Sequence, residues 1–537
     1  MRKTNFQHIL LLLSAYLFLL VWNGYTYGHG DTIEVFPYAK WLNDNSLYPF
    51  DFFIRHTVQQ VPNERYILAQ FFSWTGSAMH WVAFLLHFLC TIFLLEGLFR
   101  IAKKYITSEF LIWVAILLPI SIFYGKNLGG NEMYIPLFTS STLAKAIGIW
   151  AIYFFLKEKN KHILLVYILL AIAAFIQPIV SVQLFVILTG VIILSKFDFQ
   201  STLKLNWKDS IQGLTESQIL KKTGLGILFY LLTASVWVFL MNKKFSSGEI
   251  EKALLFDFFE FRVPHHYMPS YFPLKNYFAL GSLFLIGIYF FHKNPVPTIA
   301  GSKKELFWFF VLALLGLVFY TLGVEVFQVS SIMAAQWFKT TIWLKAFSFI
   351  ALVALFEKVL GLKSTPRTLI LEALEKLKLG FFIVGIFSIY AILNPFGRFQ
   401  VFPYDLPFSK NNNAEITISE LAKQHTPKDA LFIIPMTNTY FKHYAERSTY
   451  IDYKAVIHRK SVIPTWYQRV KEVYGIDINT RRTRTNLYAI GNDFYKKRTL
   501  QEVQAFAKKG VDYWITFKEV DLPLEKIVTN EKYVIYS

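Results

Sequence analysis

Residues 6–22, FQHILLLLSAYLFLLVW, form the first of several long apolar stretches in a chain of 537 residues. A stretch of this length is typical of a transmembrane helix, which needs about 20 apolar residues to cross a bilayer. Arg2 and Lys3 precede it, and no small-x-small cleavage site follows Trp22. We therefore expect a retained signal anchor rather than a cleaved signal peptide.

Similar apolar stretches recur along the chain, which is 54% hydrophobic and 18% aromatic and has a mean hydropathy of +0.38. These values are too apolar for an ordinary soluble protein. The sequence predicts a mainly α-helical, polytopic membrane bundle with about eleven transmembrane helices. The expected spans are 6–22, 81–99, 109–124, 137–156, 163–178, 179–195, 223–241, 274–291, 305–323, 340–357 and 379–393.

The expected orientation follows from the distribution of Lys and Arg between the loops. Alternate loops, starting with residues 1–5, carry most of the basic residues, and such loops face the cytoplasm. An odd number of spans then places the C-terminal region outside, in the periplasm or its equivalent. The formal charge of +19 is mostly accounted for by anchoring at a membrane surface, and nothing indicates a nucleic-acid partner.

The domain organisation changes near residue 394. Residues 1–393 hold the apolar stretches, and residues 394–411 form a Pro- and Gly-punctuated linker. Residues 412–537 alternate short apolar strands with amphipathic helices, which predicts a small extracytoplasmic α/β domain that folds on its own. The single cysteine, Cys90, lies in the second expected span, so no disulfide stabilises that domain. The predicted elements are helices 417–425, 437–445, 464–474 and 499–508 and strands 430–434, 449–453, 511–516 and 532–536.

The first stretch with candidate functional residues follows the first expected span. It is Gly28–His56, GHGDTIEVFPYAKWLNDNSLYPFDFFIRH. Asp31 and Glu34 are three residues apart, so on a helix both carboxylates face the same way. Such a pair serves as general base and orienting group, or it binds a divalent cation. The alternative is a capping box with Asp31 as N-cap, although Pro37 would end that helix after little more than a turn.

The second such stretch is Phe256–Pro273, FDFFEFRVPHHYMPSYFP, on the same expected side of the membrane. Its prolines make a long regular helix unexpected, so we predict a structured loop. One histidine, His265 in particular, completes a metal site with Asp31 and Glu34, or Arg262 and a histidine bind a phosphate. The alternative is an interfacial loop whose polar groups are satisfied by water.

A third group stands at Gln336–Lys339, at the outer end of an expected span. Lys339 is placed to pair with a lipid-linked phosphate, and Gln336 is a further candidate for substrate binding. The alternative is a lysine whose side chain extends to the membrane interface only for its own hydration.

The chain resembles the GT-C superfamily of integral-membrane glycosyltransferases, in particular an uncharacterised bacterial branch with an Arg-x-Pro-His-His loop. The resemblance rests on the membrane architecture and on three short motifs, which are Gly30-Asp31-x-x-Glu34, Leu47-Tyr48-Pro49-x-Asp51 and Phe261-Arg262-Val263-Pro264-His265-His266.

This resemblance implies transfer of a hexose or pentose from a polyprenyl-phosphate donor, with inversion at the sugar carbon. Asp31 would be the general base and Glu34 its orienting partner, with Mg²⁺ or Mn²⁺ as an optional cofactor. The implied location is the bacterial inner membrane, with membrane lipid and the lipid-linked donor as partners. We expect the substrate-binding residues to be Asp51, Arg262, His265, His266, Gln336 and Lys339.

The alternative class is a non-enzymatic membrane protein, such as a transporter of lipids or lipid-linked glycans or an assembly subunit. Its polar loops would bind a lipid head without breaking a bond. The sequence contains no Walker motif and no nucleotide-binding fingerprint, which argues against an ATP-driven pump.

Overall fold

The computed structural model describes residues 2–157, 159–196, 218–245, 249–293, 302–359, 405–409, 412–456 and 458–537. The chain forms two compact units, each assembled from separate stretches of sequence. The helical unit comprises Met1–Tyr25, Leu85–Val238 and Pro264–Pro403. The mixed unit, which contains helices and a β-sheet, comprises Thr26–Phe84, Phe239–Val263 and Tyr404–Ser537.

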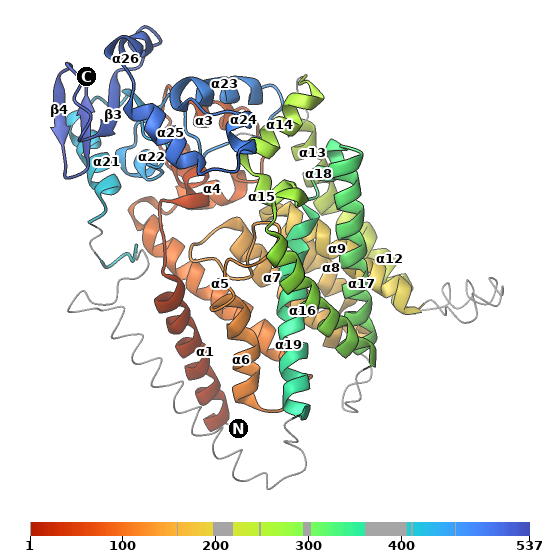
Figure 1. Cartoon of the computed structure of the whole chain (residues 1–537). Helices are drawn as coiled ribbons and strands as arrows, with labels where there is room; N and C mark the ends of the chain where they lie inside the picture. Colours follow the sequence, from red (N-terminus) through yellow and green to blue (C-terminus); the bar gives the residue numbers. More distant parts are fainter. Residues whose placement is uncertain are drawn as a thin grey trace. The chain divides into compact units, whose positions relative to one another are not determined.

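The helical unit is built mainly from long apolar helices (Figure 1). Helices α5 (Met79–Ala102) and α13 (Val236–Phe245) contribute residues to both units. The other elements of this unit are α1 (Arg2–Asn23), α6 (Glu109–Ile120), α7 (Ser140–Lys157), α8 (Lys159–Ile176), α9 (Pro178–Lys196), α12 (Gln218–Tyr230), the π-helix η3 (Leu231–Ser235), α15 (Pro264–Tyr267), η4 (Pro269–Tyr271), α16 (Leu274–Lys293), α17 (Ser302–Thr321), the π-helix η5 (Leu322–Val326), α18 (Ser330–Met333), η6 (Trp337–Thr340) and α19 (Thr341–Val359).

Six helices in the described part of the chain are long and apolar enough to cross a membrane, which indicates a membrane-embedded protein. They are Phe6–Asn23, Gly76–Ala102, Pro178–Ser195, Gln218–Lys244, Leu274–Lys293 and Lys304–Val326. Each matches one of the expected spans.

The expectation of about eleven spans is not supported. Helix α6 has 12 residues, which gives about 18 Å of helix against a hydrocarbon core of about 30 Å. The apolar helix Lys161–Ile176 is also short. Helices α7 and α19 contain the buried lysines Lys145 and Lys345, whose charges reduce their apolar character. The expected span 379–393 lies outside the described residues.

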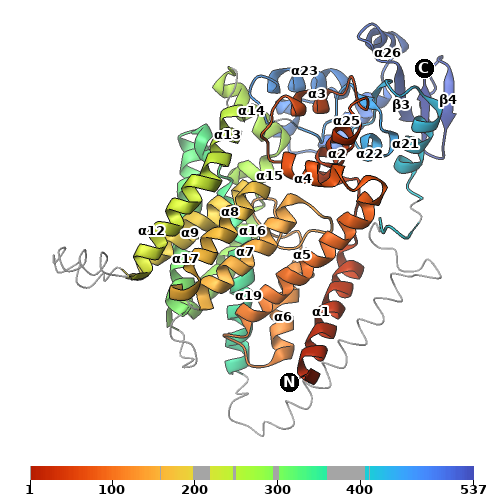
Figure 2. The same cartoon turned by 180° about the vertical axis from the view of Figure 1, so that it is seen from behind.

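The helices α7, α8, α9 and α12 of this unit pack side by side, as Figure 2 shows from behind. A buried charge network holds the segment between α6 and α7 against two helices. Lys145 Nζ donates to Asn131 Oδ1 at 2.8 Å, and Lys345 Nζ pairs with Glu132 Oε2 at 2.9 Å. Lys345 also donates to the carbonyl oxygen of Phe123 at 2.7 Å. Removing one partner from such a network leaves a buried charge uncompensated, so we assign these lysines a structural role.

The mixed unit combines a five-stranded sheet with short helices (Figure 1). Its helical elements are η1 (Gly30–Glu34), α2 (Phe36–Asn43), α3 (Phe52–Val58), α4 (Tyr66–Ser73), η2 (Gly76–Ala78), α14 (Lys252–Arg262), α21 (Ala414–His425), α22 (Phe441–Ala445), α23 (Ile463–Tyr474), α24 (Ile478–Arg482), α25 (Leu487–Lys496) and α26 (Leu500–Ala507). Its strands are β1 (Leu431–Ile433), β2 (Ser448–Thr449), β3 (Tyr513–Phe517), β4 (Lys526–Thr529) and β5 (Tyr533–Tyr536).

The sheet has the order β2-β1-β3-β5-β4. Strands β2, β1 and β3 run parallel, with Phe432 opposite Thr449 and Ile433 opposite Trp514. Strands β3, β5 and β4 run antiparallel, so the sheet is mixed. All residues of β1 and β5 are buried, as expected for inner strands covered on both faces.

The compact units divide the chain differently from the predicted domains. We expected residues 1–393 and 412–537 to form separate domains, but residues 26–84 and 239–263 belong to the mixed unit. Most of the expected linker 394–411 lies outside the described residues. The second polar stretch is also more helical than expected, because α14 runs from Lys252 to Arg262, the residue before Val263-Pro264. A residue that precedes proline disfavours the α-helical region, which explains the helix end at that point.

Candidate functional site

Asp31 and Glu34 lie on the short 3-10 helix η1, between a bend at Gly28-His29 and α2. Gly28 has φ +68° and Gly30 has φ +62°, a left-handed conformation that glycine adopts without strain. The N-cap residue is His29, which makes no side-chain cap bond, so the predicted capping box with Asp31 as N-cap is wrong. Residues three apart lie one above the other on a 3-10 helix, so the two carboxylates share a face.

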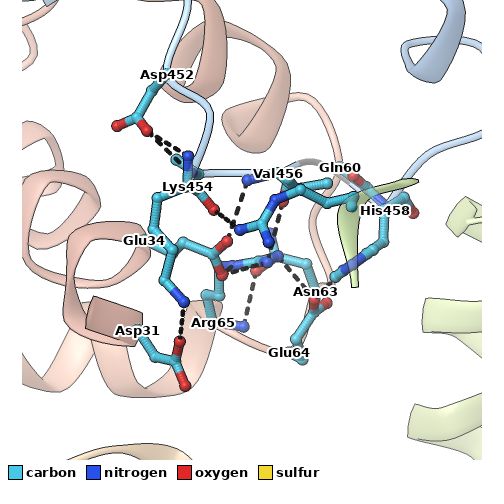
Figure 3. A network of polar contacts seen from close by, with 12 residues as sticks. Asp31, Glu34, Gln60, Asn63, Glu64, Arg65, Asp452, Lys454, Val456 and His458 are labelled. Carbon is cyan, nitrogen blue, oxygen red and sulfur yellow. Dashed lines mark hydrogen bonds and ion pairs between the residues drawn. The ribbon is translucent and has the colours of Figure 1, made fainter. Parts of the chain in front are cut away.

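Glu34 is held by an arginine from the same unit, as Figure 3 shows. Arg65 Nε and Nη2 both donate to Glu34 Oε2, at 2.8 and 2.5 Å. The other carboxylate oxygen of Glu34 accepts the backbone N–H of Val456 at 3.1 Å. Arg65 Nη1 donates to Glu64 Oε1 at 2.7 Å, and Glu64 lies 3.4 Å from Nδ1 of His458. The carboxylate of Glu34 is therefore fixed in place by charge-assisted bonds.

Asp31 faces a lysine from the C-terminal segment (Figure 3). Its Oδ1 lies 2.9 Å from Lys454 Nζ, while 68% of the Asp31 side chain stays exposed. Burial alone would lower the pKa of Lys454, but the carboxylates of Asp31 and Glu34 raise it above its ordinary value. The backbone at Lys454 is fixed by Asp452, whose Oδ1 accepts the N–H groups of Lys454 and Ala455 at 2.7 and 3.1 Å.

His29 lies beside this ion pair and was not among the predicted site residues. Its Nδ1 and Thr439 Oγ1 share a hydrogen bond, and its ring stacks on Tyr440 with the centroids 4.7 Å apart. Burial is the main cause that lowers the pKa of His29, with a further contribution from Lys454, and Asp31 opposes the shift. The imidazole is therefore neutral at pH 7.

Arg262 comes from α14 and reaches the same C-terminal segment. Its Nη2 donates to the carbonyl oxygen of Lys454 at 2.5 Å, and its guanidinium lies 5.0 Å from the centre of the Tyr453 ring. In the described part of the chain, Arg262 Nε has no hydrogen-bond partner although it is buried. Arg262 and Asp31 thus both contact Lys454, Arg262 at its backbone carbonyl and Asp31 at its side-chain ammonium group.

Asp51 is not accessible to a substrate, as a substrate-binding group would have to be. It is fully buried and is the N-cap of α3, where Oδ1 accepts the N–H of Ile54 at 2.9 Å. Its Oδ2 accepts the N–H and the hydroxyl of Thr449 at 2.9 and 2.8 Å. Lys442 Nζ lies 3.8 Å from Asp51 and 3.3 Å from Asp452. These contacts use both oxygens of Asp51, so its role is to join α3 to β2.

The metal site predicted from Asp31, Glu34 and His265 does not fit the described residues. No group of three His, Cys, Asp or Glu side chains within the described ranges is arranged to hold a metal ion. A divalent cation needs carboxylate oxygens that are not already paired with another cation. Asp31 is paired with Lys454, and Glu34 is paired with Arg65. Mg²⁺ or Mn²⁺ would have to displace Lys454 from Asp31 or Arg65 from Glu34.

His265 and His266 lie in the helical unit, on the short helix α15. Nδ1 of His266 is 2.9 Å from the carbonyl oxygen of Gly129. A Cβ added at Gly130 would stand 2.5 Å from Cδ2 of His265 and 2.7 Å from Nδ1 of His266. Both histidines therefore pack directly against the Gly129-Gly130 turn.

Gln336 and Lys339 lie near the same turn within the helical unit. Gln336 is buried, and its Nε2 donates to the Tyr267 hydroxyl at 2.7 Å. A Cβ at Gly129 would come within 2.9 Å of the backbone nitrogen of Lys339. The structure thus brings His265, His266, Gln336 and Lys339 to one region of this unit, around a turn that only glycine fits.

We expect Glu34→Gln to destabilise the mixed unit, because it removes the charge that compensates a buried arginine. Loss of a charge-assisted bond costs about 1–3 kcal/mol, so the melting temperature of the full chain should fall by several degrees. The control is Glu519→Gln, which breaks the exposed pair with Lys496 and should cost at most about 1 kcal/mol. Equal melting temperatures for the two variants, measured in one detergent, would contradict the structural role of Glu34.

A second expectation concerns pH, because the mixed unit buries a neutral histidine. His443 lies with its ring against Tyr27 and Phe36, at centroid distances of 4.9 and 5.6 Å. Burial, with Lys40 as the next cause, lowers the pKa of His443 well below its usual value. The unfolded chain binds this proton below about pH 6.5, so the contribution of His443 is present above that pH and is lost on acidification.

The loss amounts to about 2 kcal/mol at pH 5 for a histidine that stays neutral in the fold. The melting temperature of the wild type should therefore fall between pH 7 and pH 5. His443→Gln should reduce that difference, and an unchanged pH dependence in this variant would count against the assignment.

Residues 413–473 match a domain family of unknown function, DUF6798. The matched segment contains Lys442, Thr449, Asp452 and Lys454, which are the C-terminal partners of the polar residues described above. No curated protein matches the chain.

Proposed function

We propose that this chain is a membrane glycosyltransferase that moves a sugar from a polyprenyl-phosphate donor to an acceptor hydroxyl. The observation that supports it most is the contrast between two neighbouring carboxylates. Asp31 keeps 68% of its side chain exposed beside Lys454, whereas Glu34 is held by Arg65 and Val456. An acceptor can reach Asp31, and the bonds of Glu34 hold the turn on which Asp31 stands.

The chemistry assigns Asp31 the role of general base. Asp31 takes the proton of the acceptor hydroxyl as its oxygen forms a bond to the anomeric carbon. The bond from that carbon to the donor phosphate breaks, and the lipid phosphate leaves with the electron pair. Attack from the face opposite the phosphate inverts the sugar carbon, and no covalent enzyme intermediate is formed.

Two groups of residues are candidates for binding the donor. In the mixed unit, Arg262 offers a guanidinium with a buried, unpartnered Nε within the described residues. In the helical unit, His265, His266, Gln336 and Lys339 gather at the Gly129-Gly130 turn. Cationic and hydrogen-bonding side chains offset the charge that develops on a leaving phosphate.

The proposed location is the bacterial inner membrane, with the N-terminus in the cytoplasm and the C-terminal region in the periplasm. The six apolar helices support a membrane protein, and the excess of Lys and Arg in alternate loops supports a cytoplasmic N-terminus. A periplasmic C-terminal region requires an odd number of spans, that is, at least one crossing besides these six. A reporter fused after Ser537 should therefore be active outside the cytoplasm.

A second candidate is a non-enzymatic protein that binds or carries a lipid-linked glycan, or an assembly subunit. It is favoured by one observation: both carboxylates already pair with cations and tie residues 30–34 to residues 454–456. Such pairs also occur in purely structural joints.

The experiment that separates the two candidates uses the purified full chain in nanodiscs with labelled polyprenyl-phosphate hexose and pentose donors. The glycosyltransferase should release one polyprenyl phosphate for each sugar transferred. The second candidate should bind donor without cleaving it, and donor binding with no cleavage across the whole donor panel would overturn the proposed function.

A further inference from the structure

The mixed unit contains a cavity of about 780 Å³ that uses none of the residues of the Asp31 cluster. It is bounded by residues at the start of α3, by the segments that precede β1 and β3, and by residues of α23. Pockets of roughly 300–1,000 Å³ are typical of small-molecule sites. The chemical character of this cavity follows from which charged groups line it.

Two arginines, Arg55 and Arg469, supply its cationic part. The guanidinium of Arg469 lies between the rings of Tyr450 and Phe52, 4.2 and 4.8 Å from their centres. Its Nη1 also donates to the carbonyl oxygen of Tyr450 at 2.9 Å. This arrangement holds the guanidinium in one orientation before any ligand arrives, which reduces the entropic cost of binding.

Arg55 and His56 stand next to each other at the end of α3 and line the same cavity. In the part of the chain that the structure describes, neither side chain makes a hydrogen bond or an ion pair. Burial lowers the pKa of His56, and the nearby guanidinium groups of Arg459, Arg55 and Arg469 lower it further. Within the described residues, neither the guanidinium group of Arg55 nor that of Arg469 pairs with a carboxylate, so an anion is favoured between them in the cavity.

The cavity is also lined by one lysine, Lys509, and by two aspartates, Asp429 and Asp512. Lys509 pairs with Glu472. Asp429 precedes β1, and Asp512 precedes β3, where its Oδ2 accepts the N–H of Leu431 at 2.8 Å. A bare anion would be repelled by these carboxylates, but hydroxyl groups donate hydrogen bonds to them.

We infer that this cavity binds a small phosphate ester that also carries hydroxyl groups. The phosphate contacts Arg55 and Arg469, since guanidinium groups bind phosphate oxygens in pairs. The hydroxyl groups donate to Asp429 and Asp512, and the apolar parts of the ligand contact the aromatic rings of Phe52 and Tyr450. A free polyol phosphate and the headgroup of a glycerophospholipid share this chemistry.

The test measures binding of glycerol 3-phosphate to the full chain in detergent by calorimetry, with inorganic phosphate and dihexanoyl phosphatidylglycerol as further probes. Arg55→Ala should weaken binding about tenfold, the usual scale for a lost charge-assisted contact. The matched control is Lys508→Ala, which removes an exposed charge of the same sign from a residue that does not line the cavity. Equal effects of the two variants would overturn the site.

A second variant tests the hydroxyl contact. Asp429→Asn should weaken glycerol 3-phosphate but strengthen inorganic phosphate, because it removes both an acceptor and a repelling charge. Stronger binding of both probes would overturn the assignment of a hydroxyl-bearing ligand. If only dihexanoyl phosphatidylglycerol shows binding that Arg55→Ala weakens, the ligand is a lipid headgroup. If glycerol 3-phosphate shows such binding, the ligand is a soluble phosphate ester. Absence of Arg55-dependent binding to either would overturn the inference.

Discussion

Residues 412–537 expressed alone are expected to remain unfolded or to aggregate, although their sequence predicts an independent α/β domain. The structure places residues 26–84 and 239–263 in the same compact unit. Without residue 51, the buried Lys442 loses one of its two carboxylate neighbours, and Thr449 loses the acceptor of its backbone N–H and hydroxyl. Leaving a buried polar group without one of its partners costs about 1–3 kcal/mol for each such group.

Further contacts of the C-terminal segment would be lost in the same fragment. The Tyr48 hydroxyl donates to the carbonyl oxygen of Lys442 at 2.9 Å, and Phe52 stacks on the guanidinium of Arg469. Arg482 pairs with Asp257 at 2.9 Å and with Glu260 at 2.7 Å. Together these losses approach or exceed the net stability of a typical domain, which is about 5–15 kcal/mol.

Circular dichroism and limited proteolysis of the fragment check this expectation. The matched control is the full chain in detergent, probed with the same protease and expected to resist cleavage within 412–537. A cooperative thermal transition of the isolated fragment would show that the first 411 residues are dispensable for its fold.

Much of the local structure could be predicted from sequence. Strands near 430–434, 511–516 and 532–536 are short apolar runs between turn residues, and the structure has β1, β3 and β5 there. The expected helices near 417–425 and 464–474 correspond to α21 and α23. Each of these helices buries one face, which gives its sequence an amphipathic pattern. This pattern can be read from the helix sequence alone.

Other elements give weaker local signals. Strand β4, Lys526–Thr529, is half exposed at the edge of the sheet, so it lacks the apolar run of an inner strand. Helix α25 contains Gly491, Asn492 and Asp493, which have low helix propensity, and its tertiary contacts stabilise it. Arg481 and Arg482 lie in the last turn of α24. The arginines there are held by α14, a contact that sequence alone does not reveal.

The candidate site shows the same division between local and distant information. The three-residue spacing of Asp31 and Glu34 correctly predicts one shared face. Their partners could not be predicted, because Glu34 and Val456 are 422 residues apart in sequence and no local pattern marks Lys454. For Asp51 the predicted role was wrong. An aspartate in such a stretch can be a buried helix N-cap as well as a substrate-binding group, and Asp51 is the N-cap of α3.

Asp31→Asn is expected to reduce sugar transfer by about 10²-fold or more, the usual scale for loss of a general base. Asparagine keeps the size of the side chain and one hydrogen-bond acceptor for Lys454, so the protein should fold normally. The exposed position of Asp31 supports this, since substitutions of exposed ion-pair partners change stability by at most about 1 kcal/mol.

The matched control for this variant is Asp44→Asn. Asp44 is an exposed aspartate of the same N-terminal stretch, and it pairs with a lysine of the C-terminal segment, Lys428, at 2.7 Å. Both variants remove one exposed ion pair between the same two parts of the chain. A purely structural role for such pairs predicts equal effects, whereas general-base catalysis predicts a large effect at Asp31 only.

The most direct measurement is therefore the turnover of a labelled polyprenyl-phosphate sugar by the wild type, Asp31→Asn and Asp44→Asn, purified in nanodiscs and matched for melting temperature. We expect transfer by the wild type and by Asp44→Asn at similar rates, and about 10²-fold slower transfer by Asp31→Asn. Wild-type turnover in Asp31→Asn would contradict the assignment of Asp31 as general base.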